Sequence, residues 1–217
     1  MLVARNIHKS YGKLQVLKGI DLEVTKGEVI SIVGASGAGK STLLHILGTL
    51  DRPDQGTVQL RGLDLFDMKN GELAKVRNEN VGFVFQFHNL LPEFSALENV
   101  CMPGFISNKD KSILTPKADE LLKILGINGR SEHKPSQLSG GEQQRVAVAR
   151  ALINEPDIVF ADEPSGNLDS KNAEDLHSIF FKLREELDQT FVIVTHNDHL
   201  ADMADRKIEL VDGRIKA

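Results

Sequence analysis

The chain has 217 residues, of which 41% are hydrophobic and 26% charged, and its formal net charge is −5 at pH 7. This length suits one α/β domain with a substantial buried core, and an acidic balance with scattered lysines and arginines argues against nucleic acid as a partner. A single cysteine, no basic-then-apolar leader and no apolar run near the roughly 20 residues of a membrane span indicate a cytosolic protein without direct membrane insertion.

The N-terminal segment alternates between apolar and polar residues. Its runs 2–7 and 16–24 predict antiparallel strands, because turn residues interrupt the pattern at 11–13 and 25–28. Tyr11, the only tyrosine of the chain, lies in the first turn. The residues leave two interpretations open: the ring stacks on an adenine, or it is a half-buried aromatic at a strand end.

The segment Gly34–Thr42 has the G-x-x-x-x-G-K-[ST] pattern of a phosphate-binding loop, with a strand-like run before it and an apolar helical run after it. Glycines let the backbone curl so that successive N–H groups point at phosphate oxygens, and the helix adds the positive end of its dipole. We expect Lys40 to reach the β- and γ-phosphates and Ser41 to offer its hydroxyl to Mg²⁺. The expected phosphate-binding residues are Gly34, Ala35, Ser36, Gly37, Ala38, Gly39, Lys40, Ser41 and Thr42.

Two further short strands are predicted in the middle of the chain, at 57–60 and 81–85. The polar stretch between them, from 64 to 80, has a weak helical pattern. The second run is apolar throughout, which fits a strand buried on both faces, and it stops at Gln86.

Helical patterns dominate from about residue 87 to 150, and we interpret this stretch as an inserted helical subdomain. Thr115–Pro116 has the form of a helix start, because proline fits the first helical position, and Gly126 has the form of its end. Apolar residues at Asn89–Phe94 lie in a predicted loop. They are either a docking surface or local core.

The last third of the chain adds a second glycine-rich helix start, Ser139-Gly140-Gly141, which is suited to an anion. The stripe of apolar residues between 171 and 187 predicts a long helix. The predicted elements are helices over 142–152 and 171–187, strands over 158–163 and 191–195, and a C-terminal hairpin over 207–215 turning at Asp212-Gly213. The strand over 191–195 is the last one expected to be parallel.

Four predicted strands run into residues with functional side chains: the phosphate loop, Gln86, the pair Asp162 and Glu163, and His196. Ligands of open parallel sheets bind beyond the carboxyl ends of the strands, so we expect these residues to meet around one nucleotide. Asp162 is expected to hold Mg²⁺, Glu163 to point at the water that attacks the γ-phosphate, and His196 to hydrogen-bond that phosphate. For Gln86, contact with the metal and contact with the water both remain open.

The helix start at Ser139 does not fit this single site. A γ-phosphate already held by the loop, Lys40 and a metal leaves little room for a second complete anion site in the same chain. We therefore expect Ser139, Gly140 and Gly141 to bind the nucleotide of a second copy.

The motif Leu138–Arg145 (LSGGEQQR), together with the phosphate loop and Asp162-Glu163, resembles the ATP-binding subunits of ABC transporters along essentially the whole chain. The resemblance implies an α/β fold, a P-loop NTPase of ABC type with a mainly parallel core sheet, an N-terminal antiparallel β subdomain and the helical insertion, in one domain over 1–217. It also implies that Tyr11 stacks on adenine, that residues 165–169 contact a partner subunit, and that two copies sandwich two ATP molecules head to tail.

Within this family, the segments 85–100 and 161–169 resemble most the ATPases of lipoprotein-releasing systems. The expected function is therefore ATP hydrolysis that drives separate permease subunits through the loop 86–94, with the chain peripheral on the cytoplasmic face of the inner membrane. The alternatives are ATPases of macrolide export and regulatory ATPases that gate a periplasmic cell-wall hydrolase. Ala38 and Ser165 stand where relatives often have Ser and Thr, and we expect no fused membrane domain.

Overall fold

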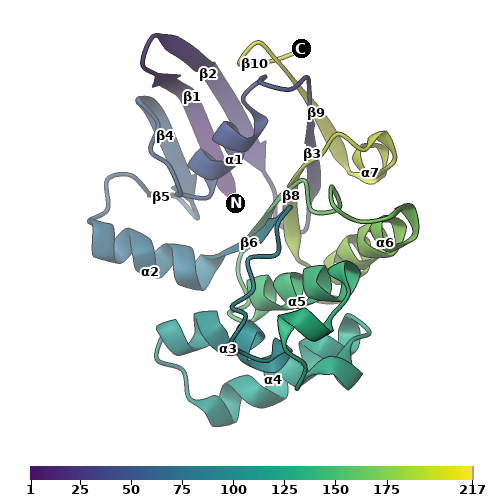
Figure 1. Ribbon diagram of the computed structural model, residues 1–217. Helices are drawn as coiled ribbons and strands as arrows, with labels where there is room; N and C mark the ends of the chain where they lie inside the picture. The colour runs from purple at the N-terminus through teal and green to yellow at the C-terminus, as the bar shows by residue number, and fades with distance from the viewer. Residues whose placement is uncertain (217) are drawn as a thin grey trace.

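A computed structural model describes residues 1–216 and contains two β-sheets with helices between and beside them (Figure 1). One sheet has the strand order β2-β1-β4-β5 and the other β10-β9-β3-β8-β7-β6. The strands are β1 (Leu2–Tyr11), β2 (Leu14–Val24), β3 (Val29–Val33), β4 (Gln55–Leu60), β5 (Leu63–Asp64), β6 (Val81–Phe85), β7 (Ile158–Asp162), β8 (Thr190–Val194), β9 (Arg206–Val211) and β10 (Arg214–Ile215). The helices are α1 (Lys40–Leu47), α2 (Asn70–Asn80), α3 (Ala96–Ile106), α4 (Lys111–Ile124), α5 (Gly140–Leu152), α6 (Ser170–Leu187) and α7 (Asp198–Met203).

The second sheet is mainly parallel and buried on both faces. β3, β6, β7, β8 and β9 pair in parallel, and only β10 runs against its neighbour among the described strands. Side chains of β8 alternate between two apolar clusters, with Phe191 and Ile193 in one and Val192 and Val194 in the other. Continuous apolar strands are typical of a sheet covered on both sides. The predicted parallel core sheet is confirmed.

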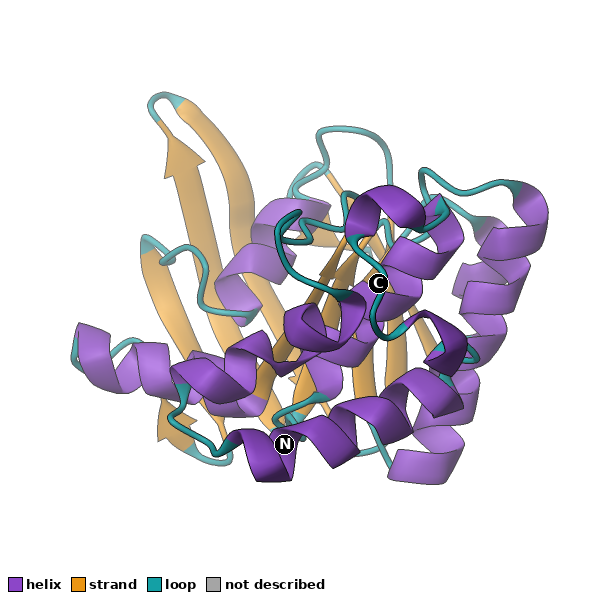
Figure 2. Cartoon of the chain, turned by 60° about the horizontal axis from the view of Figure 1, so that its bottom comes forward, coloured by secondary structure: helices purple, strands orange, loops and turns teal. Residues whose placement is uncertain are grey.

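The antiparallel sheet covers one side of this core. β1 pairs antiparallel with both β2 and β4. Helix α1 lies between the two sheets, and its Leu43 and Ile46 share one apolar cluster with Ile7 of β1 and Ile32 of β3 (Figure 1). Figure 2 shows the antiparallel strands standing to one side and helices in front of the other sheet. The phosphate loop therefore begins a helix that is held from two sides.

Helices α3, α4 and α5 pack together at the end of the molecule away from the antiparallel sheet (Figure 1). Val100, Leu122 and Val148, one from each helix, belong to the same apolar cluster as Phe191 and Ile193 of β8. Within residues 1–216, no helix is both long enough and apolar enough to span a membrane.

The predicted start of α4 at Thr115–Pro116 is wrong, because the helix begins a turn earlier, at Lys111. Asp110 caps this earlier start by accepting a hydrogen bond of 2.7 Å from the Ser112 N–H. Pro116 therefore lies inside the helix, where it removes one backbone hydrogen bond. Burial of Leu114 within the added turn offsets that loss.

The expectation that residues 191–195 form the last parallel strand is also wrong. β9 (Arg206–Val211) pairs with β3 in parallel, with Val33 opposite Glu209, and so joins the C-terminal hairpin to the sheet. Its side chains are mostly exposed, since β9 lies near the edge of the sheet. The sequence of β9 consequently lacks the continuous apolar run that identified the central strands.

Glu28, just before β3, forms hydrogen bonds with the turn after β2 and with the start of β9. Its carboxylate accepts hydrogen bonds of 2.8 Å from the Thr25 N–H, the Thr25 hydroxyl and the Arg206 guanidinium. Burial alone raises the pKa of this carboxyl, but the Thr25 and Arg206 contacts outweigh it and lower the pKa below its ordinary value of 4.5. The charged form is therefore the one that stabilises the fold.

We predict that Glu28→Gln lowers the free energy of unfolding at pH 7 by about 1–3 kcal/mol, because charge-assisted hydrogen bonds are lost. The pKa of Glu28 is lower in the folded than in the unfolded state. Its contribution to stability is therefore fully present above the unfolded pKa of about 4.5, and it is lost as the pH falls through the folded pKa. Urea unfolding between pH 7 and about pH 3.5 should show the two proteins converging at low pH. The exposed Glu185→Gln serves as the control, and a difference independent of pH would contradict the prediction.

Candidate functional site

The phosphate loop leaves the carboxyl end of β3 and leads directly into α1. Gly39 is the N-cap of α1 at φ 102°, in the left-handed region, and contributes no side-chain cap. The first helical hydrogen bond runs from the Leu43 N–H to the Gly39 carbonyl, so the N–H groups of residues 40–42 precede the helical ladder. Gly34 has φ 150°, and a Cβ there would lie 2.2 Å from the Leu210 carbonyl oxygen. The loop therefore presents backbone donors to an anion, as its motif predicts.

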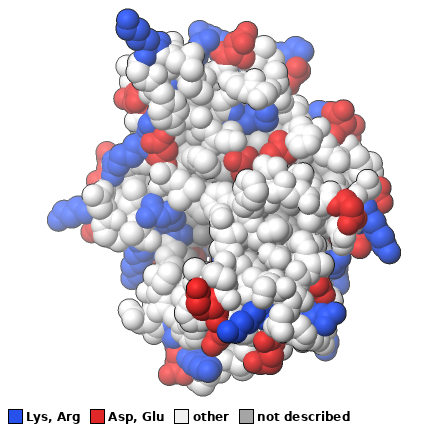
Figure 3. All heavy atoms as spheres, in the orientation of Figure 1, with Lys and Arg blue, Asp and Glu red and all other residues white. Residues whose placement is uncertain are grey.

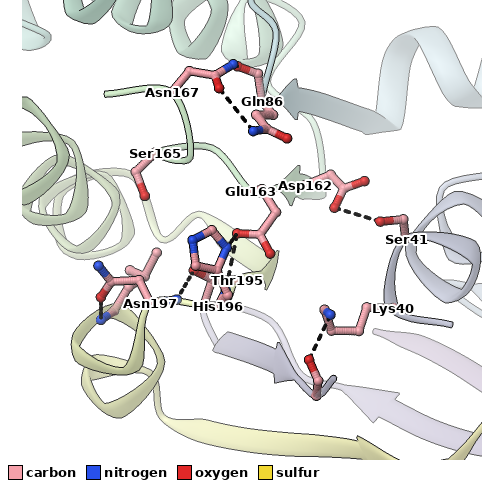
Figure 4. Close-up of polar contacts among 12 residues, drawn as sticks. Lys40, Ser41, Gln86, Asp162, Glu163, Ser165, Asn167, Thr195, His196 and Asn197 are labelled. Atoms are coloured by element: carbon pink, nitrogen blue, oxygen red, sulfur yellow. Dashed lines mark hydrogen bonds and ion pairs between the residues drawn. The ribbon is translucent and has the colours of Figure 1, made fainter. Parts of the chain in front are cut away.

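Lys40 and Ser41 begin the helix and point to different partners (Figure 4). The Lys40 ammonium donates hydrogen bonds to the Gly34 and Ala35 carbonyls, at 2.8 and 3.1 Å. The Ser41 hydroxyl donates to the Asp162 carboxylate at 3.0 Å. A hydroxyl and a carboxylate oxygen from two different elements are ligands that Mg²⁺ accepts, since this ion takes few protein ligands and completes its shell with water and phosphate.

Asp162 and Glu163 are neighbours in sequence but take separate directions. Asp162 is the last residue of β7, whereas Glu163 turns away with φ 47°, a left-handed conformation that is uncommon outside glycine. The Glu163 N–H donates to the Val194 carbonyl at 2.9 Å, which holds the turn against β8. The Glu163 carboxylate contacts His196 twice, at 2.7 Å from Nδ1 and 3.2 Å from the backbone N–H (Figure 4). Glu163 is 19% exposed and His196 72% exposed.

Gln86 is held by Asn167, a residue of the segment 165–169 that was expected to contact a partner subunit and not Gln86. Its side-chain amide donates to the Asn167 side chain, and the Asn167 amide donates back to the Gln86 carbonyl, both at 3.1 Å (Figure 4). Asn167 lies in the turn after Glu163, so this turn connects the end of β6 with the end of β7. The two residues are 81 positions apart, and no local pattern relates them.

The second glycine-rich helix start, at Ser139, is exposed and already capped. The Ser139 side chain and N–H form a capping box with Glu142 at the start of α5. Hydrogen bonds from the Ser139 N–H and hydroxyl, followed by the Arg130 contact, lower the pKa of the Glu142 carboxyl. A Cβ on Gly140 would meet only Leu168, at 3.8 Å, and Gly141 packs against Asn172. These residues lie beside the turn after Glu163, and their own contacts do not include the loop at Lys40.

Tyr11 is the last residue of β1 and pairs with Leu14, so the prediction that it lies in the turn is wrong by one position. The residue is 52% exposed, and its hydroxyl donates to Asp51 at 2.6 Å. Asp51 follows α1 and was not selected from the sequence. A half-exposed tyrosine at the end of a strand is compatible with both interpretations, so the stacking of adenine on this ring stays a prediction.

The register of the sheet brings most of the predicted site together. Phe85 pairs with Asp162, Asp162 with Val194 and Ile32 with Val194, so β6, β7, β8 and β3 end at one edge. A cavity of about 700 Å³ beside this edge is lined by Gly34, Ala35 and His196 together with Lys207, Glu209 and Lys216, and it does not include Lys40 or the carboxylates of Asp162 and Glu163. Another, of about 480 Å³, lies at the opposite edge near Asp157 and Asp188, away from these side chains. Figure 3 shows that the face over α5 and the β6–α3 loop is largely uncharged, with charges of both signs around it.

The sequence model of the family described as ABC transporter matches residues 17–166. The lipoprotein-releasing system ATP-binding protein LolD of Bacteroides thetaiotaomicron is 59% identical over 216 residues, covering 100% of this chain and 99% of its own. LolD of Cytophaga hutchinsonii is 60% identical, with 99% and 98% covered, and LolD of Porphyromonas gingivalis is 54% identical, with 98% and 97% covered.

Solved structures agree with these relatives. A dimeric structure of a post-hydrolysis state of the ATP-binding cassette MJ0796 bound to ADP and Pi is 41% identical, has a TM-score of 0.90 and covers 100% of this chain and 97% of its own. The ABC transporter protein cbiO1 of Clostridium perfringens has a TM-score of 0.90 at 26% identity, with 100% and 86% covered. The chain therefore belongs to the ABC transporter family and is one of its ATP-binding, ATP-hydrolysing cassettes.

Proposed function

We propose that this chain is the ATPase subunit of a lipoprotein-releasing ABC transporter, acting as a dimer with separate permease subunits on the cytoplasmic face of the inner membrane. The observation that carries this proposal is the identity of 54–60% over nearly the full length with relatives from three organisms that are all named LolD. The expected single domain over 1–217, with its helical insertion at about 87–150, is part of the proposal.

In this proposal the loop Gly34–Thr42 binds the phosphates of ATP through its backbone N–H groups. Lys40 exchanges the Gly34 and Ala35 carbonyls for the β- and γ-phosphates. Ser41 and Asp162 would hold Mg²⁺, whose positive charge neutralises the developing negative charge on the phosphates. Their mutual hydrogen bond of 3.0 Å already places two oxygen ligands beside each other.

Glu163 is proposed as the residue that orients the attacking water and accepts its proton. His196 lies against that carboxylate and, being largely exposed, has room to turn toward the γ-phosphate. Gln86 and Asn167 hold the turn after Glu163, so that Gln86 contacts either the metal or the water from a fixed position. The four side chains belong to three strand ends at one edge of the sheet.

The exposed start of α5 is proposed to bind the nucleotide of a second copy through Ser139, Gly140 and Gly141. Its helix dipole favours an anion, and the residues lie apart from the chain's own phosphate loop. A two-fold dimer then has two equivalent sites, each built from both chains. The largely uncharged face over α5 suits contact with another protein surface.

The loop 86–94 is proposed as the contact for the permease. Phe87 is 67% exposed, and Leu91 and Phe94 are exposed beside it. A cavity of about 470 Å³ between Phe85 and Ile106 adjoins this loop. Because Gln86 begins the loop, its position transmits the state of the nucleotide site to the docked permease. Of the two interpretations of residues 89–94, docking surface or local core, the proposal therefore adopts the docking surface.

We predict that Glu163→Gln lowers steady-state ATP hydrolysis by about 10²- to 10⁴-fold, the range of a lost general base. ATP binding persists, because the amide leaves the phosphate loop unchanged. The variant should therefore accumulate as an ATP-bound dimer in size-exclusion chromatography, whereas Glu185→Gln behaves as the wild type. Wild-type turnover by Glu163→Gln would contradict the assignment of Glu163 as the general base. Monomeric elution at saturating ATP would argue against the dimer.

Mixing two inactive variants tests whether each site is shared between chains. Lys40→Ala disables the phosphate loop, and Gly140→Asp places a negative charge where the partner's phosphates would bind. The fold tolerates the latter, because an acidic residue favours a helix N-terminus and a Cβ there meets only Leu168. In a mixed dimer one site contains both defects and the other contains neither. Random pairing of equal amounts makes about half of the dimers mixed, so up to about a quarter of all sites should be intact and active.

The matched control mixes Lys40→Ala with Glu163→Gln. Both defects belong to the same half of a site, so every site in such a dimer is defective and activity stays absent. Equal recovery in the two mixtures, or no recovery in the first, would contradict the shared site.

Co-purification from membranes tests the transported class. Tagged Glu163→Gln, solubilised with ATP, should bring down a permease with a large periplasmic domain and lipid-anchored protein, identified by mass spectrometry. A permease bound to cell-wall hydrolases would favour the regulatory alternative, and a permease without lipoprotein would favour the export alternative. The Lys40→Ala protein is the control for nucleotide dependence, and the absence of any membrane protein would contradict the proposal.

A further inference from the structure

Tyr11 is held by its hydroxyl at the exposed end of β1. The hydroxyl donates to Asp51 Oδ2 at 2.6 Å, although half of the side chain remains exposed. A tyrosine at a strand end would otherwise change rotamers freely in water. The Thr42 side chain, at the end of the phosphate loop, lowers the pKa of the same phenol, against the larger effect of Asp51.

Asp51 is itself fixed from several directions. Its Oδ1 accepts hydrogen bonds of 2.7 Å from the Lys9 ammonium and from the Arg52 N–H. Its own N–H donates to the His45 carbonyl of α1 at 3.2 Å. The Lys9 ammonium also donates to the Arg52 carbonyl at 2.6 Å, and the Lys9 side chain is only 11% exposed. Asp51 is therefore an anchor attached to the same helix that presents Lys40.

Lys9 also defines which face of the tyrosine ring is open. The Lys9 ammonium lies over the Tyr11 ring, 5.2 Å from its centroid. Residues 9 and 11 project from the same side of β1, since side chains alternate along a strand. The ammonium thus covers one face of the Tyr11 ring. The opposite face is the one left open to solvent.

We propose that Asp51 and Lys9 are positioning residues for the base of ATP: together they lock the Tyr11 ring in place so that the adenine stacks on the ring face opposite Lys9. This inference rests on the proposed function, in which Tyr11 contacts the base. A ring that is already ordered avoids the conformational entropy that binding would otherwise cost, and a value typical of one immobilised side chain corresponds to about 3- to 10-fold in affinity. The carboxylate acts through the tyrosine and touches no nucleotide atom.

The composition of the chain supplies a direct spectroscopic test, because it has one tyrosine and no tryptophan. The chain also has ten phenylalanines, but the absorbance of the ionised phenol lies at longer wavelengths than theirs and therefore reports Tyr11 alone. The Asp51 hydrogen bond, followed by burial, raises the pKa of the Tyr11 phenol above its ordinary value of 10.0. In Asp51→Asn, which keeps the shape of the side chain, absorbance titration should give a lower phenol pKa than in the wild type. An unchanged pKa would overturn the lock.

Binding is measured with ADP, which carries the base but is not hydrolysed, and with pyrophosphate, which lacks the base. Asp51→Asn and Tyr11→Phe should each weaken ADP by about 3- to 10-fold and leave pyrophosphate binding as in the wild type. The double variant should bind ADP no more weakly than Tyr11→Phe, because Asp51→Asn weakens the same hydrogen bond that Tyr11→Phe removes. Lys9→Met should weaken ADP in the same way.

Three outcomes separate this inference from the proposed function. Weakened ADP binding in Tyr11→Ala with wild-type affinity in Asp51→Asn would overturn the positioning role and leave the base contact intact. Pyrophosphate weakened in parallel with ADP in Asp51→Asn would also overturn it, since the residue would then act through the phosphate loop or the fold. Wild-type ADP affinity in Tyr11→Ala would overturn the base contact and the positioning role together.

Discussion

The alignment of four strand ends at one edge of the parallel sheet is the constraint on which the site depends. Phe85, Asp162, Val194 and Ile32 stand side by side across β6, β7, β8 and β3, and each strand is buried on both faces. A slip of one residue would exchange the apolar side chains of both faces and would move the carboxylates off the edge at the same time. The packing of the core and the assembly of the nucleotide site are consequently specified by the same register.

The two glycine-rich helix starts differ in how many of their first backbone N–H groups are free to bind an anion. At α1 the N-cap is Gly39, which has no side chain to satisfy the first N–H groups, so these groups are available to an anion within the chain. At α5 the N-cap is Ser139, whose capping box with Glu142 satisfies part of the helix end while Gly140 remains exposed. One helix start is thus suited to hold phosphate strongly, and the other to complete a site whose main ligands lie elsewhere.

The sequence predicted what depends on local pattern and missed what depends on distant contacts. Apolar runs located β6, β7 and β8, and the glycine motif located the phosphate loop, because periodicity and turn chemistry act over a few residues. The early start of α4 was missed because a cap at Asp110 outweighed the signal of Pro116. The partner of Gln86 was missed because the pairing with Asn167 exists only after folding. The same holds for the acceptor of the Tyr11 hydroxyl.

The position of Lys40 has a consequence for the kinetics of nucleotide capture. Its ammonium bridges the Gly34 and Ala35 carbonyls, so the loop is held curled by its own side chain. In the proposed binding mode an incoming triphosphate would meet a formed loop, and Lys40 would exchange two neutral acceptors for charged ones without the folding of a disordered segment. Association with such a preformed site is limited by diffusion and orientation, whereas differences in affinity among nucleotides are expressed in how fast they leave.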